Sequence, residues 1–274
     1  MPSEQKKEVT AFLRPGAVSH KESRLFVILG AFFLTNALVA EFMRVKIFSV
    51  EKTFGLQPIS FSFFGEKMEG FQMTCGVLLW PFVFVMTDII NEYFGRKGVR
   101  FFSIIGAVMI GYAFVMLNLA MGTSPAAWWI TSSNFGDKLD FQNAYNAVFG
   151  QGANIIIGSI TAFLIGQFVD VAVFHRIKKL TGEKFLWLRA TGSTFVSQFI
   201  DTFIVLFVAF YFLRWGKENQ WTIQLVLAVG CLNYIFKFLM AILMTPLIYL
   251  FHVLVEKYLG HELAGEMRKE AMKN

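Results

Sequence analysis

The chain has 274 residues, of which 55% are hydrophobic, 16% are charged and 33 are phenylalanine. A soluble globular domain carries about 25% charged residues, so this composition excludes that class and indicates an integral membrane protein. The net charge of +6 does not indicate nucleic-acid binding, because no basic cluster alternates with aromatic residues and the charges lie between apolar segments. We therefore read the charges as signals of membrane topology.

Six apolar segments are long enough to cross a membrane, since about 20 helical residues span ~30 Å of hydrocarbon. The fourth segment is expected to begin with a bent or interfacial turn around Gly150 and Gly152, and the last to tilt or to break near Pro246. The predicted fold is an all-α integral membrane protein, a six-transmembrane-helix bundle. In chain order, the spans cover residues 24–43, 71–91, 101–121, 148–174, 190–213 and 222–254.

Lysine and arginine give the orientation, because cytoplasmic segments retain a positive excess. Seventeen of them lie in the N-terminal tail, after the second span, between the fourth and fifth spans and at the C-terminus, whereas seven lie on the opposite side. Both termini are therefore predicted to be cytoplasmic. We expect a cytoplasmic tail of residues 1–23, one transmembrane domain of residues 24–255 and a second cytoplasmic tail of residues 256–274.

Polar residues interrupt the first two spans. Asn36, toward the outer side of the first span, either holds helices together or contacts a ligand. Asp88 lies at the end of the second span, where a charge costs up to about 2.5–3.5 kcal/mol on insertion scales, so it is a functional candidate. Glu92, one turn later, is expected to be solvated at the interface. Pro81 is expected to kink this span and free backbone carbonyls.

Spans four to six carry a second set of polar residues. Gln167 and Asp170 are three apart and share a helical face in the inner third of the membrane. Asp201 lies near the middle of its span, and Lys237 lies at the same level of the next. The two are expected to pair, either as a structural ion pair or as a pair that responds to substrate or protons. Asp201 belongs to one stripe with Thr194, Ser197 and Gln198.

The spacing of the histidines, cysteines and serines indicates no metal site, no redox site and no hydrolytic site. The histidines have no H-x-x-x-H or cysteine partner, and Cys75 and Cys231 show no paired spacing. There is no Walker A sequence and no readable Ser-His-Asp arrangement, so we predict neither an enzyme nor a cofactor or metal site. An ATP motor would have to come from another chain. The binding or permeation of a small polar solute remains.

Four segments together resemble the queuosine precursor transporter family, over residues 24–255. They are WPFVFVMTDIINEYFG, GQFVDVAVFHRIKK, RATGSTFVSQFIDTFIVLFVAFY and NYIFKFLM. The resemblance implies a multi-pass carrier of the cell inner membrane. Its nucleobase-like substrates would be 7-cyano-7-deazaguanine, 7-aminomethyl-7-deazaguanine or queuine, imported for tRNA modification.

The resemblance carries over the motif positions Asp88, Gln167, Asp170, Ser197, Gln198, Asp201 and Lys237, and Asn36 less securely. The following roles are our own expectation from the depth and the chemistry of each residue. Asp201 and Asp170 are expected to touch the ligand and Lys237 to balance their charge, while Asp88, together with Glu92 and Pro81, is expected to have a gating or structural role at the inner side. A flat base could stack on Trp80, Tyr234 or Phe199. The expected substrate-binding set is Asn36, Gln167, Asp170, Ser197, Gln198, Asp201 and Lys237.

Two alternatives stay open. The chain could be a substrate-binding membrane subunit for another vitamin-like solute that works with a partner ATPase. It could also be a membrane scaffold that transports nothing. The sequence leaves open the preferred deazaguanine, the coupling to protons or sodium, and the assembly into homo-oligomers.

Overall fold

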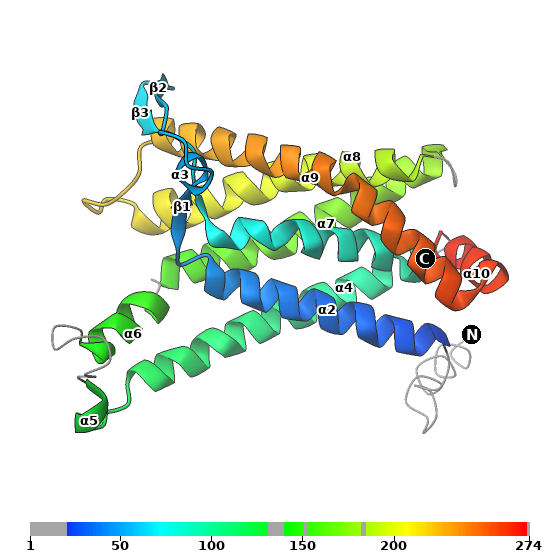
Figure 1. Ribbon diagram of the computed structural model, residues 1–274, viewed down its shortest axis with the longest axis horizontal. Coiled ribbons are helices and arrows are strands. Elements are labelled where there is room, and N and C mark those ends of the chain that lie inside the picture. Colours follow the sequence, from blue (N-terminus) through cyan, green and yellow to red (C-terminus); the bar gives the residue numbers. More distant parts are fainter. Residues whose placement is uncertain (1–20, 131–139, 151–152, 182–184, 273–274) are drawn as a thin grey trace.

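The computed structural model describes residues 21–130, 140–150, 153–181 and 185–272, which are mostly helical. Five helices are long and apolar enough to cross a membrane. They lie side by side in one bundle (Figure 1). The bundle consists of α2 (Lys21–Met43), α4 (Trp80–Met121), α7 (Ala153–Thr181), α8 (Leu186–Leu206) and α9 (Ile223–Leu259).

Helix α4 contains most of the second predicted span and all of the third. Its 42 residues are interrupted at Gly95, where φ is 69° and ψ is −170°. The two arms run in opposite directions along the bundle (Figure 1). This backbone conformation is open essentially only to glycine, because a Cβ would collide with neighbouring backbone atoms. The apolar periodicity predicted two spans here, and the glycine explains how they follow each other without a loop.

The connection before α4 is a folded substructure rather than part of a span. Strand β1 (Ile47–Ser49) pairs antiparallel with β4 (Gln72–Thr74), and β2 (Ser60–Phe63) pairs with β3 (Glu66–Glu69). Helix α3 (Val50–Thr53) and the 3-10 turn η2 (Cys75–Leu78) complete it. The predicted start of the second span at residue 71 was therefore wrong by nine residues.

Other helix ends also differ from the sequence expectation. A short helix α5 (Ala127–Ile130) and α6 (Phe141–Phe149) precede α7, so the fourth predicted span is divided at Gly150, whereas Gly152 lies outside the described residues. Helix α8 continues as a π-helical turn η4 (Phe207–Tyr211) and a 3-10 turn η5 (Phe212–Arg214). Helix α9 passes through Pro246 without ending.

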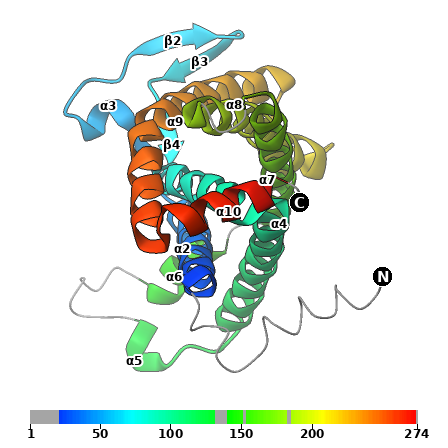
Figure 2. The same ribbon diagram turned by 90° about the vertical axis from the view of Figure 1, so that its right-hand side faces the viewer.

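The two ends of the bundle differ. One end, which we call the basic end, holds the last helix, α10 (His261–Ala271) (Figure 1). The start of α2, the reversal of α4 and the ends of α7 and α9 lie at the same end. The strands, α5 and α6 lie at the other, the hairpin end. Viewed from the basic end, α10 lies across the bundle (Figure 2). It packs against α4 and α9.

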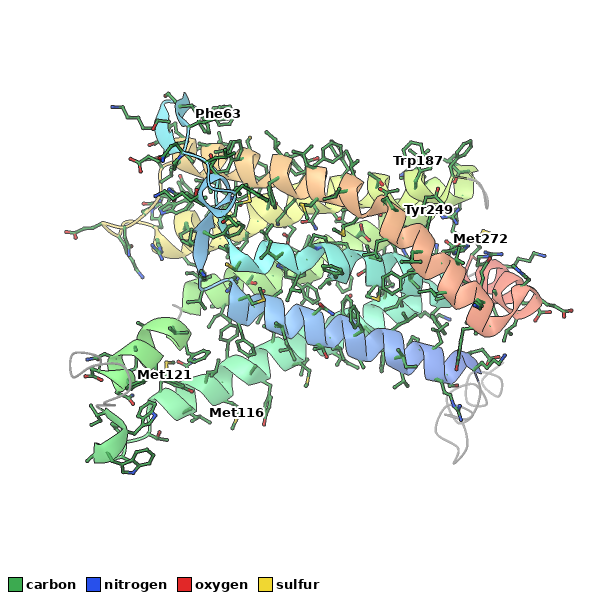
Figure 3. The ribbon with its side chains drawn as sticks, in the orientation of Figure 1. Phe63, Met116, Met121, Trp187, Tyr249 and Met272 are labelled. Atoms are coloured by element: carbon green, nitrogen blue, oxygen red, sulfur yellow. The ribbon has the colours of Figure 1, made fainter. Side chains whose placement is uncertain are left out.

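Apolar side chains cover the outside of the bundle as well as its core. Met116, Trp187 and Tyr249 point away from it (Figure 3), and each is 42–46% exposed. Inside, Phe33, Ile89 and others pack together. An apolar exterior around a buried polar interior suits lipid rather than water. The chain is a multi-pass membrane protein.

We predict that Gly95→Ala destabilises the fold. The new side chain would adopt a positive φ, and its Cβ would lie 3.1 Å from the Ala271 carbonyl oxygen of α10. Such strain costs about 1–3 kcal/mol, so the midpoint of thermal unfolding in detergent should fall. Gly265→Ala on α10 is the control, because a Cβ there meets no atom within 4 Å. Equal midpoints for the two variants would contradict the prediction.

Candidate functional site

A narrow inner cavity lies between the first arm of α4 and helices α8 and α9. Trp80, Pro81 and Phe84 form an apolar wall on α4, and methionines and Ile248 form another on α9. Pro81 is in the first turn of α4, where its missing N–H costs no hydrogen bond. The expected kink at Pro81 was therefore wrong: it begins the helix. The polar lining residues are Asp88, Thr191, Thr194, Gln198 and Lys237.

The polar lining of the inner cavity is incompletely hydrogen-bonded. Both carboxylate oxygens of Asp88 and the Nε2 atom of Gln198 are buried without a partner among the described residues. An unsatisfied buried polar group costs about 1–3 kcal/mol, and a charged one more, so such groups in a cavity wall mark a place where a ligand can bind. The cavity offers acceptors on one wall and an N–H donor on another.

Behind the cavity wall lies a second row of buried polar groups on α7 and α8. Ser197 Oγ donates to Asp170 Oδ1 at 2.9 Å, and Thr87 Oγ1 donates to Gln167 Oε1 at 3.1 Å. The other carboxylate oxygen of Asp170 and Nε2 of Gln167 have no partner among the described residues. Gln167 and Asp170 lie one turn apart on α7, as their spacing predicted, and neither lines a cavity.

A wider outer cavity lies among α2, α7, α8 and α9. Glu41 of α2 forms an ion pair with Arg44, the residue directly after that helix, with an Oε2–Nε distance of 3.0 Å. Ser159 Oγ of α7 donates to Glu41 Oε1 at 2.8 Å. All three residues line the outer cavity. Sequence reasoning missed Arg44, although its spacing of three from Glu41 is that of a helical ion pair.

The ion pair of Asp201 and Lys237 separates the two cavities. Lys237 Nζ lies 2.8 Å from Asp201 Oδ2 and also donates to Thr202 Oγ1 at 3.1 Å. Lys237 and Trp80 line both cavities, whereas Asp201 lines only the outer one. The pairing of these two residues, expected from their equal depth, is confirmed.

A buried ion triad closes the polar interior toward the basic end. Glu92 Oε2 lies 2.9 Å from Lys178 Nζ, and Glu92 Oε1 lies 2.7 Å from Arg189 Nη2; all three side chains are at most 2% exposed. The expectation that Glu92 is solvated was therefore wrong. Sequence reasoning missed Lys178 and Arg189 as partners, because both flank an interhelical turn and were counted as topology charges.

A hydrogen-bond network lies beside the triad at the basic end. His175 Nε2 bonds Asn91 Oδ1 at 2.7 Å, and Tyr93 Oη bonds His252 Nδ1 at 2.8 Å. Arg268 of α10 bonds both His252 and Glu256 of α9. These contacts fasten α10 to the end of the bundle.

Other expected site residues lie elsewhere. Asn36 donates to the Phe32 carbonyl oxygen of its own helix at 2.8 Å and lines neither cavity, so its role as a ligand contact stays a prediction. Of the three aromatic candidates, Trp80 lines both cavities. Tyr234 donates to the Phe195 carbonyl oxygen, and Phe199, 49% exposed, packs against its ring outside the cavities.

Comparison with known proteins gives the family. Residues 74–251 match the family described as "Putative vitamin uptake transporter". The "Probable queuosine precursor transporter" of Bacillus subtilis is 30% identical over 184 residues, which cover 67% of this chain and 73% of the relative. The chain belongs to the queuosine precursor transporter family. The "Queuosine precursor transporter" of Escherichia coli is 29% identical over 63% of this chain and 69% of that protein. No solved structure matches.

The match to the transporter family covers most of the buried charges described above. Asp88, the ion triad and the Asp201–Lys237 pair lie within residues 74–251, whereas Glu41 and Arg44 lie before them. The relatives in this family are named as transporters and not as enzymes. The multi-pass architecture agrees with that class.

We predict that Glu92→Gln destabilises the protein strongly. The change removes the only charge of the triad that opposes Lys178 and Arg189, and breaking a buried ion pair costs about 3–5 kcal/mol. Thermal unfolding in detergent should show a large fall in midpoint, part of which Lys178→Met restores in the double variant. Glu218→Gln, on the exposed connection before α9, is the control. A midpoint for Glu92→Gln equal to that of the control would contradict the role of the triad.

Proposed function

We propose that the protein imports queuosine precursors, the 7-deazaguanine bases used for tRNA modification, across the cell inner membrane. The family of the chain supports a transporter of this kind. The observation that carries the proposal is the inner cavity, where Asp88 and Gln198 present unpartnered polar atoms beside Trp80.

The chemistry of a deazaguanine base matches this cavity. Its ring N–H and exocyclic amine are neighbouring donors, and the two oxygens of Asp88 can accept both as a bidentate pair. The amide of Gln198 can donate to the carbonyl edge, and the Trp80 ring offers an apolar face for the flat ring system. A base bound in this way satisfies polar atoms that are otherwise buried without partners.

The cavity also changes which carboxylates we propose as direct contacts. Asp201 is already paired with Lys237, and Asp170 lies behind the wall with one oxygen bonded to Ser197. We therefore assign the direct contacts to Asp88 and Gln198, with Asp170, Gln167 and Ser197 supporting them from behind. Asp201 and Lys237 would control passage from the outer cavity, because Lys237 lines both spaces.

We further propose six membrane crossings with both termini in the cytoplasm. The antiparallel arms of α4 account for the sixth crossing (Figure 1). The start of α2 and the end of α10 lie at the basic end (Figure 1). The positively charged segments counted from the sequence lie on the same side, and the positive-inside rule assigns that end to the cytoplasm.

Uptake by cells that cannot make queuosine precursors tests the function. Expression of the wild-type chain with 7-cyano-7-deazaguanine in the medium should restore queuosine in tRNA, measured by mass spectrometry of its nucleosides. Asp88→Asn should reduce uptake at least tenfold, because it replaces one of two acceptors with a donor, a loss of roughly 1.4 kcal/mol or more. Asp140→Asn is the matched control, since Asp140 caps α6 outside both cavities and asparagine caps as well. Wild-type uptake by Asp88→Asn at equal expression would remove Asp88 from the site.

Cysteine accessibility tests the proposed orientation. In a chain with Cys75 and Cys231 replaced by serine, Glu218→Cys at the hairpin end should react with a membrane-impermeant maleimide on intact spheroplasts. Lys269→Cys on α10 should react only after the membrane is permeabilised. Both positions are exposed in the structure. The opposite pattern of labelling would invert the orientation, and labelling of both sites from outside would contradict a membrane crossing by α9, which lies between them.

A further inference from the structure

The buried charges around the inner cavity do not balance. Three carboxylates, those of Asp88, Glu92 and Asp170, face two cations, Lys178 and Arg189, and all five side chains are at most 2% exposed. With every group ionised, this cluster carries one net negative charge inside an apolar bundle. Lys237 does not correct the balance, because it is paired with Asp201.

The negative charge that no cation balances lies on Asp88 and Asp170. Glu92 bonds both cations of the cluster directly. Asp88 interacts electrostatically with Asp170, Glu92 and Arg189, so two of the three charges that it faces repel it. Both of its oxygens and Oδ2 of Asp170 lack a partner among the described residues. Two interacting carboxylates buried in a dry site cannot both stay ionised without a counter-charge.

We propose that Asp88 and Asp170 share one proton, which is the ion co-transported with the solute. The proton enters from water on the hairpin side and forms an O–H bond with Asp170 Oδ2, which leaves both oxygens of Asp88 able to accept from the base. This O–H bond breaks when the proton leaves to water on the basic side, with no transfer of electrons. One proton makes the cluster neutral, which lowers the cost of burying it. This inference rests on the proposed function, because the solute must first be shown to cross.

The surroundings favour a proton over a metal cation. A hard cation such as Na⁺ or Mg²⁺ binds several oxygen atoms together, whereas only three oxygens of this pair are unpartnered. The amide Nε2 atoms of Gln167 and Gln198 also lack a partner among the described residues, and as donors they repel a cation. His175, the nearest histidine along α7, is bonded to Asn91.

Purified protein in liposomes tests the coupling, with the membrane potential clamped at zero and 7-cyano-7-deazaguanine as the solute. One proton per solute gives a concentration ratio of about tenfold for each unit of pH difference, and a pH dye should report proton entry when solute is added. A sodium gradient should drive no accumulation. Accumulation driven by sodium, or solute exchange that no gradient accelerates, would overturn the proposal. Failure of the wild type to exchange any deazaguanine would instead overturn the proposed function.

The Asp170→Asn variant tests whether the pair of Asp88 and Asp170 carries the transported proton. Asparagine keeps an acceptor for Ser197 but carries no titratable proton, so the tenfold ratio should fall to about one. Asp140→Asn should keep the wild-type ratio. If Asp170→Asn does not fold, Ser197→Ala replaces it: the ionised carboxylate loses a donor, and the midpoint of the pH dependence of uptake should move to higher pH. A tenfold ratio in Asp170→Asn, or an unmoved midpoint in Ser197→Ala, would overturn the role of Asp170.

Discussion

Ion pairing in a medium without water is the constraint on which this structure depends. Each buried charge must meet its partner from another turn or another helix, because lipid supplies no hydrogen bonds. Glu92 joins the first arm of α4 to α7 and α8, and the Asp201–Lys237 pair joins α8 to α9. These pairs decide which faces of otherwise apolar helices turn inward, a choice that Phe, Leu and Ile alone leave open because lipid accepts them equally.

The sequence predicted the parts of this arrangement that depend on depth. Residue counting along two spans is enough to pair Asp201 with Lys237, since each residue of a helix adds about 1.5 Å. Counting failed for Glu92, Lys178 and Arg189. Residues near the end of a span can be solvated or can turn into the bundle, and only the packing of α4 on α7 decides between the two. Because charges near the ends of spans were assigned to topology, the buried ion pairs of Glu92 with Lys178 and Arg189 were not predicted.

The start of α4 shows a second limit of reading hydropathy. Residues 71–79 are apolar enough to extend a span, but Gln72–Thr74 pair with β1, and Phe71 N–H donates to Glu51 Oε1 at 2.9 Å. The partners in these bonds lie twenty or more positions earlier in the chain, so no local pattern could predict them. Pro81 was the one local signal, because proline in the first turn marks the start of a helix. Its alternative meaning, a kink, is equally consistent with the sequence.

The cavities and the triad make the two ends of the bundle different in how easily the inner cavity can open toward each. Lys237 and Trp80 line both the outer and the inner cavity, so under the proposed function a shift of these two side chains would connect the two spaces. Toward the basic end, Glu92 lies one turn beyond Asp88, and its two bonds tie α4 to α7 and α8. A path to that end must part these bonds, and α10 with its Arg268 contacts covers the same region. Because a separated buried pair costs several kcal/mol, the hairpin end is the easier one to open in this conformation.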